Sequence, residues 1–252
     1  MTCQPDPQLE LMFSFYERLR RLGPGSESST RRALSLISGL PPNPCIVEFG
    51  CGAGAATMIL ASTNAHVTAV DIHQPFLDAL NTQARQAGLD SNITTLQADM
   101  ADPPLPDGVF NLVWSEGAAY IAGFEAALRR WRRLLRQGGH IAVSEGTWLS
   151  DSRPTEWSEF LANACAAATS IEHNLAILRS TGYEPLAHFA LPPEDWSETY
   201  YAPLRPQLTL FREERQADSA AQAFADELDH EMELWTKYHD YYSYVFYVAK
   251  AV

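Results

Sequence analysis

Acidic residues follow several apolar, β-prone segments of the sequence, each at the point where the segment ends. The four acids are Asp71, Asp99, Glu116 and Glu145. A carboxylate can accept hydrogen bonds from a ribose or an amine, and it can also take a proton as a general base. Because the carboxyl ends of parallel strands meet at one edge of a sheet, where ligands bind, we expect these acids to surround one site.

A glycine-rich turn precedes all four acids. Residues 45–55 read Cys-Ile-Val-Glu-Phe-Gly-Cys-Gly-Ala-Gly-Ala, and the helix-compatible residues 56–61 follow. Glycine tolerates positive φ and lets a ligand lie against bare backbone. The N-terminus of the following helix offers unpaired N–H groups and a positive dipole end. The segment therefore predicts a buried strand, a tight turn and a site for a nucleotide-like ligand.

This turn is compatible with two classes of enzyme. Gly50-x-Gly52-x-x-Ala55 satisfies the dinucleotide fingerprint in a loose form, and Asp71 lies near the expected position of a ribose-binding acid. Glu48, inside the predicted strand, suits a cationic amine better than a pyrophosphate. The sequence also has no tyrosine followed by lysine four residues later, the pair of short-chain dehydrogenases. An NAD(P)-dependent oxidoreductase stays open as the alternative.

Helical and strand patterns alternate along the chain, which is typical of βαβ units and a parallel sheet. Helices are expected at 9–22, 30–38, 171–180 and over an acidic stretch at 207–238, and another ends at Gly138-Gly139. Strands are expected at 45–49, 65–70, 93–98, 109–114, 140–144, 183–189 and 244–249. Ser28 to Thr30 are expected to cap the second helix.

Length and composition describe one ordinary globular domain. The chain has 252 residues, 46% of them hydrophobic, and a net charge of −13, which argues against a large nucleic-acid footprint. We interpret the basic cluster at 129–136 as the solvated face of an amphipathic helix. Four cysteines without a CxxC pair, no signal peptide and no membrane-length apolar run favour a cytoplasmic protein with reduced thiols. The histidines show no metal-ligand spacing, so no metal site is expected.

At this level of detail the chain resembles the class I S-adenosylmethionine-dependent methyltransferases. The resemblance covers the motifs at 48–54, 70–72, 97–100, 110–116 and 134–139, in the order and spacing of the family. Segments 23–26, 114–120 and 237–242 further resemble a subgroup of uncharacterised bacterial small-molecule methyltransferases. One departure is Asn111, where many relatives have an aspartate; we expect it to affect packing only.

The resemblance implies an α/β fold: a Rossmann-like, mostly parallel sheet of seven strands with one antiparallel strand and helices on both faces. The last strand is then inserted antiparallel beside the fifth. We expect a single domain over 1–252. It comprises a helical N-terminal cap at 1–40, a cofactor-binding core at 45–147, and substrate-side additions with the last two strands at 148–252.

The resemblance also implies roles for individual residues. Gly50 and Gly52 would pass under the methionine part of the cofactor, and Asp71 would bind the ribose hydroxyls. Ile72 and Met100 would enclose the adenine, and Asp99 would take its amino group. The full expected cofactor-binding set is Glu48, Gly50, Cys51, Gly52, Asp71, Ile72, Asp99, Met100 and Ser115.

The implied reaction is transfer of a methyl group from S-adenosylmethionine to a small-molecule acceptor, leaving S-adenosylhomocysteine. Glu116, Tyr120 and Glu145 are the candidates for acceptor-side catalysis, or else ordinary polar residues at strand ends. The aromatic set Trp148, Trp157, Trp196, Tyr200 and Tyr201, together with the carboxylates of this acidic chain, favours a neutral or cationic acceptor. A cofactor-binding protein without catalysis remains a second alternative, and the oligomeric state is left open, a homodimer included.

Overall fold

A single mixed sheet forms the centre of the molecule in the computed structural model, which describes residues 7–163 and 168–252. The strand order is β3-β2-β1-β4-β5-β8-β7, with the short β6 paired to β5. The strands are β1 (Cys45–Phe49), β2 (His66–Asp71), β3 (Ile93–Gln97), β4 (Phe110–Glu116), β5 (Leu135–Trp148), β6 (Thr169–Ser170), β7 (Tyr183–Ala190) and β8 (Tyr242–Ala251).

The expected topology is confirmed. Strands β3, β2, β1, β4 and β5 are parallel, whereas β8 lies antiparallel between β5 and β7. The difference from the seven expected strands is β6, a two-residue strand parallel to the end of β5. Asn111 has a packing role, because its side-chain oxygen accepts a hydrogen bond of 2.9 Å from the Cys45 N–H and holds the start of β1 beside β4.

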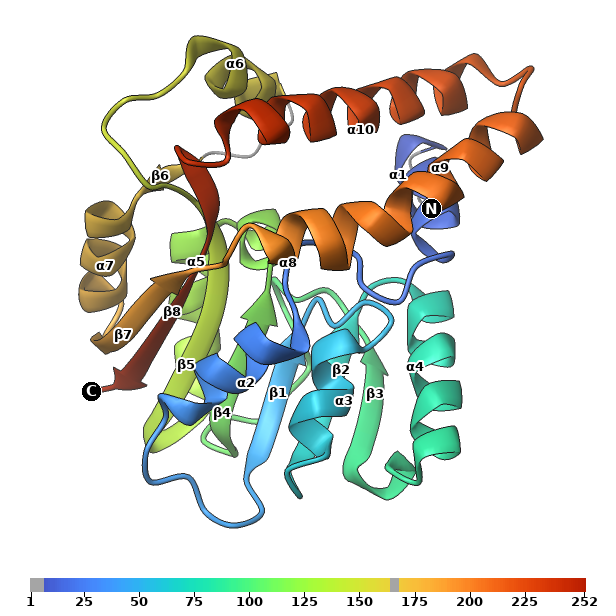
Figure 1. The fold of residues 1–252 in the computed structure, drawn as a ribbon. Helices are drawn as coiled ribbons and strands as arrows, with labels where there is room; N and C mark the ends of the chain where they lie inside the picture. The colour runs from blue at the N-terminus through green and yellow to red at the C-terminus, as the bar shows by residue number, and fades with distance from the viewer. Residues whose placement is uncertain (1–6, 164–167) are drawn as a thin grey trace, which may run out of the picture.

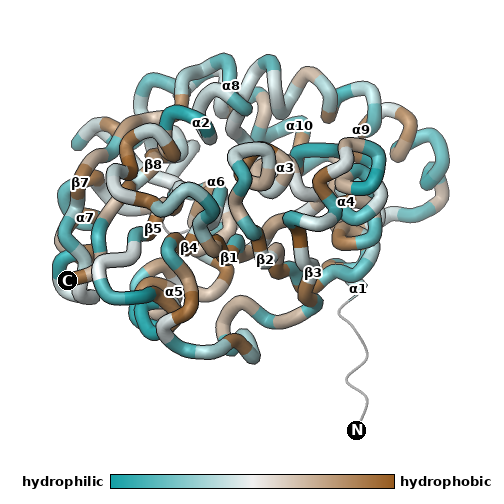
Figure 2. Tube along the Cα trace, turned by 90° about the horizontal axis from the view of Figure 1, so that it is seen from below, coloured by the Kyte–Doolittle hydropathy of each residue, from teal (hydrophilic) through white to brown (hydrophobic). Residues whose placement is uncertain are grey.

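Helices cover both faces of the sheet (Figure 1). On one face lie α2 (Glu27–Ser35), α3 (Ala55–Ala61) and α4 (Gln74–Ala87); on the other lie α5 (Phe124–Trp131) and α7 (Ile171–Ser180). Short helical turns η1 (Asp90–Asn92), η2 (Ala119–Ala122) and η3 (Arg132–Leu134) join these elements. Figure 2 shows the apolar residues concentrated along the central strands, with polar segments on the outside.

A third layer of helices lies beyond the carboxyl ends of the strands (Figure 1). It contains α1 (Pro7–Tyr16), α6 (Thr155–Asn163), α8 (Glu194–Trp196), η4 (Ser197–Tyr201), α9 (Ala202–Glu214) and α10 (Ser219–Tyr238). These helices share a hydrophobic cluster of their own, which includes Phe15, Trp157, Phe211 and Trp235. Within the described residues, no helix is both long and apolar enough to cross a membrane.

Two predicted elements at the end of the parallel sheet were wrong in extent. The helix expected to run to Gly138-Gly139 ends at Trp131, and β5 spans 135–148 instead of 140–144. The reason is an irregularity in the pairing of β4 with β5, where Phe110 pairs with Leu135 but Leu112 pairs with His140. Gly138, at φ 70°, lies in the extra residues of β5. The Gly138-Gly139 pair is therefore part of a β-bulge and does not end a helix.

Helix boundaries near the N-terminus and in the acidic stretch also differ from the predictions. The first helix ends at Tyr16 rather than residue 22, and the second starts at Glu27, capped by the Ser26 side chain, which accepts from the Ser29 N–H. The acidic stretch is two helices, because Asp218 caps a new helix, α10. Among the cysteines, Cys45 and Cys51 are free thiols, and Cys3 and Cys165 lie outside the described residues.

The arginines of the basic cluster hold neighbouring loops in place. Arg130 donates to the Ala101 carbonyl, Arg132 to the Gly182 carbonyl, and Arg136 to the Val109 carbonyl. Arg133 pairs with Asp107 and donates to the Leu105 carbonyl. The cluster is therefore more than a solvated helix face, since it fastens the loops that lead into β4 and β7.

The glycine turn has the geometry its sequence predicts. Gly50, Gly52 and Gly54 all have positive φ, of 66°, 51° and 87°. The N–H groups of Gly50 and Cys51 donate to the Val70 carbonyl, which ties the turn to the end of β2. A Cβ at Gly54, the residue preceding α3, would lie 2.2 Å from Leu80 of α4. Glycine is thus needed here both for φ and for the close approach of α4.

This crowding gives a stability prediction. Gly54→Ala adds a clash with Leu80 to the cost of a left-handed conformation, whereas Gly88→Ala, at φ 68° with no atom within 4 Å of the added Cβ, carries only the conformational cost. We expect Gly54→Ala to lower the free energy of unfolding by about 1–3 kcal/mol more than Gly88→Ala. Urea denaturation of both variants measures the difference, and equal losses would mean that α4 adjusts freely.

Candidate active site

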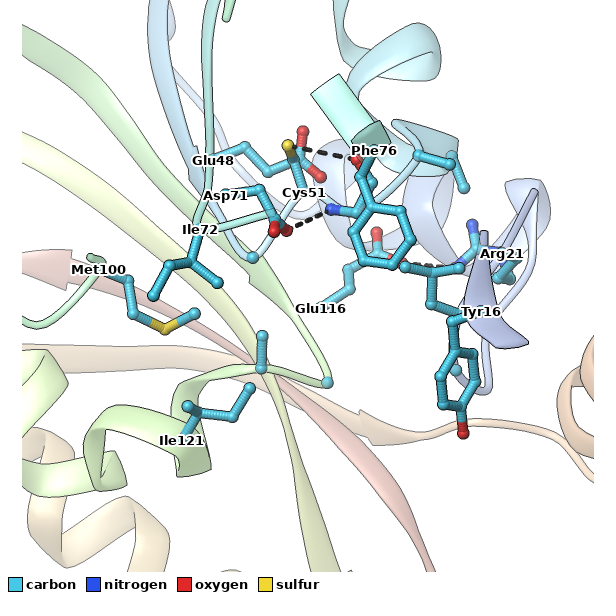
Figure 3. Close-up of a pocket in the computed structure, with 18 of the residues that line it drawn as sticks. Tyr16, Arg21, Glu48, Cys51, Asp71, Ile72, Phe76, Met100, Glu116 and Ile121 are labelled. Carbon is cyan, nitrogen blue, oxygen red and sulfur yellow. Dashed lines mark hydrogen bonds and ion pairs between the residues drawn. The ribbon is translucent and has the colours of Figure 1, made fainter. Parts of the chain in front are cut away.

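A cavity of about 360 Å³ opens at the carboxyl ends of β1, β2 and β4, within the size range of small-molecule sites (Figure 3). The glycine turn and the first residues after β2 and β4 form one side of the cavity. The N-terminal segment forms the other side. The expected residues that line it are Glu48, Gly50, Cys51, Gly52, Asp71, Ile72, Asp99, Met100, Glu116 and Tyr120. Ser115 and Glu145 lie outside the lining.

Glu48 places a carboxyl group at the base of the cavity. It is only 3% exposed, and the hydroxyl of Thr57 in α3 donates to its Oε2 at 2.5 Å. Burial raises the pKa of Glu48 to about 8, although the Thr57 hydrogen bond acts in the opposite direction. An incoming ammonium group would favour the ionised form of Glu48 and could then pair with it.

Asp71 both shapes the turn and faces the cavity. Its Oδ2 accepts the Gly52 N–H at 2.8 Å, and its Oδ1 accepts the His73 N–H at 2.9 Å. Burial raises its pKa, against the effect of these hydrogen bonds. Each carboxylate oxygen can accept a second hydrogen bond, so the group remains able to bind a pair of hydroxyls.

The residues after β2 and β3 form an apolar side of the cavity. Ile72 is 56% exposed, and Figure 3 shows its side chain and that of Met100 pointing toward the same space. Asp99 is exposed beside them, and its Oδ1 accepts the Ala101 N–H at 2.7 Å. The buried Cys51 thiol points to the Gly52 carbonyl at 3.6 Å, and burial raises its pKa. The exposed aliphatic side chain of Ile72, which faces the cavity, suits the face of an aromatic ring.

Ser115 stands apart from this group, because successive side chains of a strand alternate between the two faces. It is fully buried within β4, and its hydroxyl donates to the Phe49 carbonyl of β1 at 3.0 Å. The residues on either side of it, Trp114 and Glu116, share the opposite orientation, and the Trp114 indole N–H donates to Glu116.

Glu116 is the point where the sheet and the N-terminal segment are joined. Its Oε2 accepts from the Arg21 guanidinium at 2.9 Å, and its Oε1 accepts from the Thr30 hydroxyl at 2.7 Å and the Trp114 indole at 3.0 Å. The side chains of Arg21 and Glu116 are 15% and 9% exposed, so this ion pair is largely withdrawn from water. Both oxygens of Glu116 are therefore already occupied by donors.

Tyr120 and Glu145 occupy neighbouring but different positions. Tyr120, in η2, lines the cavity and is 41% exposed. Glu145 follows Ser144, the residue that pairs with Glu116 in the sheet, and is only 6% exposed. Its Oε2 has no hydrogen-bond partner among the described residues, and burial raises its pKa to about 8. Glu145 is thus a buried carboxyl group outside the cavity lining.

The N-terminal segment, which we did not predict to reach the site, closes the cavity from above. Leu9, Met12 and Tyr16 of α1 line it, as does Arg21 after the helix. The position of α1 is fixed by His73, whose ring stacks on Phe13 at 4.2 Å and whose Nε2 lies 2.7 Å from a Glu17 carboxylate oxygen. The apolar residues at helical spacing in this segment indicate a helix with one buried face. They do not show which part of the protein that face contacts.

The predicted aromatic set does not line the cavity. Trp148, Trp157, Trp196, Tyr200 and Tyr201 are all buried in the cluster under the third helical layer. No group of three or more His, Cys, Asp or Glu residues that could hold a metal ion occurs in the described parts of the chain.

The raised pKa of Glu48 predicts how stability varies with pH. Between 4.5 and about 8 the folded protein keeps a proton that the unfolded chain releases, so the free energy of unfolding falls as pH rises in this window. Glu48→Gln removes this contribution, and we expect the decline between pH 6 and 8 to flatten by up to about 1.4 kcal/mol per pH unit. Denaturation at pH 6, 7 and 8 checks this, with exposed Glu233→Gln on α10 as the control. An unchanged slope would show that Glu48 is ionised in the folded protein.

The Arg21–Glu116 pair should behave as one unit. Removing either partner leaves the other buried without its opposite charge, which costs more than removing both. For Arg21→Met, Glu116→Gln and the double variant, we expect a coupling energy of about 1–3 kcal/mol in chemical denaturation. Arg31–Glu27, an exposed pair within α2, serves as the comparison and should give well below 1 kcal/mol. Additive losses at the buried pair would contradict the joining role of Glu116.

Comparison with known proteins relates the glycine turn and the strands around it to methyltransferases. Residues 46–139 match a family model described as a methyltransferase domain. A sterol 24-C-methyltransferase of Gibberella zeae is 28% identical over 178 residues, which are 66% of this chain and 46% of that protein. The 27-O-demethylrifamycin SV methyltransferase of Amycolatopsis mediterranei is 27% identical over 170 residues, 63% of this chain and 62% of that protein. The chain thus spans about half to three fifths of the length of these relatives.

A solved structure agrees over the whole chain. A methyltransferase of Geobacter sulfurreducens, described as dependent on S-adenosylmethionine and crystallised with S-adenosyl-L-homocysteine, has a TM-score of 0.82. The two chains are 18% identical, and the match covers 100% of each, which establishes the shared fold. Residues 46–139 thus resemble a methyltransferase domain, and the whole chain shares the fold of this S-adenosylmethionine-dependent methyltransferase.

Proposed function

We propose that this protein transfers the methyl group of S-adenosylmethionine to a small-molecule acceptor by in-line displacement. The observation that carries the proposal is that one cavity is lined both by the glycine turn with Asp71 and by the acceptor-side residues Glu116 and Tyr120. A donor and an acceptor can therefore meet within one cavity.

The residues of the cavity fit the cofactor chemically. Glu48 would bind the ammonium group of its methionine end, and Asp71 the ribose hydroxyls. Arg20 lines the cavity and makes no ion pair within the described residues, so it would pair with the cofactor carboxylate. Ile72 and Met100 would enclose the adenine, with Asp99 near its amino group. Cys51 would contribute packing, and Ser115 would act only by holding β4 against β1.

When bound, the sulfonium supplies a methyl group that is already activated, so the protein mainly has to position the acceptor. Alignment of reacting atoms can lower a barrier by about 7–11 kcal/mol. Tyr120 would contact the acceptor directly. Glu116 would act as a positioning residue, because Arg21, Thr30 and Trp114 already hold both of its oxygens. The apolar side chains of α1 that line the cavity would exclude water from the reacting centre.

We further infer a single domain, a cytoplasmic location and no nucleic-acid partner. The net charge of −13 and the structural use of the arginines at 129–136 support the last of these. A homodimer is compatible with this proposal and is not required by it, since one chain supplies every residue assigned above.

Ligand binding tests the proposal directly. S-adenosylhomocysteine at a hundred times its dissociation constant should stabilise the protein by about 2.7 kcal/mol, which raises the melting temperature by roughly 5–10 °C. NAD and NADP at the same concentrations should give no shift. A shift with a dinucleotide, and none with S-adenosylmethionine or S-adenosylhomocysteine, would favour the oxidoreductase alternative.

Asp71 should dominate the binding of the ribose. Hydrogen bonds to a charged acceptor contribute about 1.5–3 kcal/mol, so we expect Asp71→Ala to weaken S-adenosylhomocysteine binding at least tenfold. Asp102→Ala provides the matched control, because Asp102 is exposed and lies outside the cavity. Calorimetry on both variants at matched folded fraction, judged by circular dichroism, separates lost contact from lost turn geometry. Equal affinities would remove Asp71 from the site.

A further inference from the structure

Four large apolar or aromatic side chains of the cavity lining lie outside the hydrophobic cores of the protein. They are Leu9 and Met12 of α1, and Tyr120 and Ile121 of η2, and we call them the apolar rim. None of the four belongs to the three clusters of buried apolar side chains in the described residues. Leu9 is 39% exposed, Tyr120 41% and Ile121 64%. Exposed apolar side chains that gather at one cavity mark a surface that a ligand covers.

Helix α1 is apolar on two faces. One face packs into the third helical layer, where the ring centroid of Phe15 lies 5.3 Å from that of Phe211. The other face lines the cavity with side chains at the spacing of a single helical face, Leu9, Met12, Phe13 and Tyr16. A helix needs one apolar face to join the fold, so the second face of α1 is available to a ligand.

The short turn η2 carries the rest of the rim. Ala119 of this turn is buried in the core and Ala122 packs against the same cluster, whereas Tyr120 and Ile121 between them line the cavity. In Figure 3, Ile121 of η2 and Tyr16 of α1 lie on different sides of the open space. Two elements that are distant in the sequence therefore present apolar side chains to one cavity.

The ion pair beside the rim is complete in itself. Arg21 and Glu116 both line the cavity, 2.9 Å apart and largely withdrawn from water. A cationic ligand could pair with Glu116 only by displacing one of its three donors, and an anionic ligand could pair with Arg21 only by displacing the Glu116 carboxylate. Either exchange breaks contacts of a largely buried ion pair, which is costly. An uncharged ligand leaves the pair intact.

The other charged side chains of the cavity are matched by the proposed cofactor. Besides the ion pair, the described lining contains four of them, Arg20, Glu48, Asp71 and Asp99. In the proposed binding mode, Glu48 takes the ammonium group, Arg20 the carboxylate, and the two aspartates the ribose and the adenine amine. No charged side chain of the described lining is then left to bind a charged acceptor.

We propose that the methyl acceptor is an uncharged molecule with an apolar body, which lies between α1 and η2 against the apolar rim. This inference rests on the proposed methyl transfer. The rim supplies affinity, because covering exposed apolar surface is favourable. The Arg21–Glu116 pair supplies selectivity, because a charged acceptor would have to break it. Of the neutral and cationic acceptors that the composition favours, the cavity selects the neutral ones.

Three phenols of nearly the same shape test the charge preference without requiring the natural acceptor. The compound para-tert-butylphenol is neutral, para-hydroxyphenyl trimethylammonium is a cation, and para-hydroxybenzenesulfonate is an anion. In protein saturated with S-adenosylhomocysteine, we expect the neutral phenol to bind at least tenfold more tightly than either ion, as measured by calorimetry or by ligand-observed NMR. Equal or tighter binding of an ion, or binding of none of the three, overturns the assignment of a neutral acceptor.

Variants of the rim then locate the binding site. The double variant Leu9→Gln with Ile121→Gln should weaken binding of the neutral phenol at least fivefold, because polar groups replace apolar contacts. The affinity for S-adenosylhomocysteine should stay within about threefold, because neither residue is assigned to the cofactor. The matched control is Leu210→Gln, which should change neither affinity, since Leu210 is 46% exposed on a helix, α9, and lies outside the cavity lining.

Two results with the double variant would contradict the proposal. Unaltered binding of the neutral phenol removes the rim from the acceptor site, and loss of S-adenosylhomocysteine binding assigns the rim to the cofactor instead. Both substituted side chains are exposed, which favours a folded variant. If it does not fold, the three phenols on the unmodified protein still decide the charge preference.

Variants of the ion pair test the source of the selectivity. Arg21→Met leaves Glu116 without its opposite charge, so the cationic phenol should bind at least fivefold more tightly than it does to the unmodified protein. Glu116→Gln leaves Arg21 free, so the anionic phenol should gain in the same way. The double variant should gain neither ion. Absence of a gain in both single variants would overturn the role of the pair in excluding charged acceptors.

Two further measurements separate this inference from its alternatives. If S-adenosylhomocysteine binds and the phenols show no preference, the inference fails while the proposed function stands; if S-adenosylhomocysteine does not bind, the proposed function itself fails. Vesicles of phosphatidylcholine test a membrane surface as the partner of the rim. Vesicle binding that the Leu9→Gln, Ile121→Gln variant loses, without binding of the neutral phenol, would overturn the proposal.

Discussion

Burial of carboxyl groups at the carboxyl edge of a parallel sheet is the constraint on which this site depends. Strand ends bring acids together where water is largely excluded, and a charged group there needs partners. The number of hydrogen-bond partners differs from one of these acids to the next. Glu116 is fully engaged by an arginine, a threonine and an indole, whereas Asp71 has two backbone N–H partners and can accept a further hydrogen bond at each oxygen. Glu48 has one hydroxyl partner, and Oε2 of Glu145 has none.

This grading separates residues that hold the fold from residues that remain available to ligands. A fully engaged carboxylate fixes geometry, because any new contact must displace an existing donor. A carboxyl group with spare acceptor capacity stays neutral, or is costly, until a ligand supplies the missing hydrogen bond or charge. Burying Glu48 and Glu145 without a full set of partners lowers the free energy of unfolding. This cost is expected for residues that bind ligands, since unsatisfied groups concentrate at functional sites.

Much of this arrangement could be predicted from local sequence patterns. The alternation of strands with helices and the turn at Gly50 to Gly54 follow from periodicities and from glycines at positions that need positive φ, whereas the antiparallel last strand was implied by the resemblance to methyltransferases. The extent of β5 could not, because a bulge in its pairing with β4 depends on contacts between strands. Nor could the partners of Glu116, since Arg21 and Thr30 lie 95 and 86 residues away in the chain. The orientation of Ser115 was in principle readable from strand alternation, which places it opposite Glu116.

The position of β8 between β5 and β7 has a consequence for how the chain acquires its structure. Thr147 of β5 pairs with Ser243 of β8, and its hydroxyl lies 3.1 Å from that of Tyr247, a residue 100 positions later. During synthesis the fourteen-residue β5 must therefore wait with an open, apolar edge until its neighbour has been made. Such long-range pairing is slow and exposes intermediates to aggregation. Helices α6, α9 and α10 and strand β7 are encoded between β5 and β8, so β8 is made last and inserts between two strands, β5 and β7, that already exist.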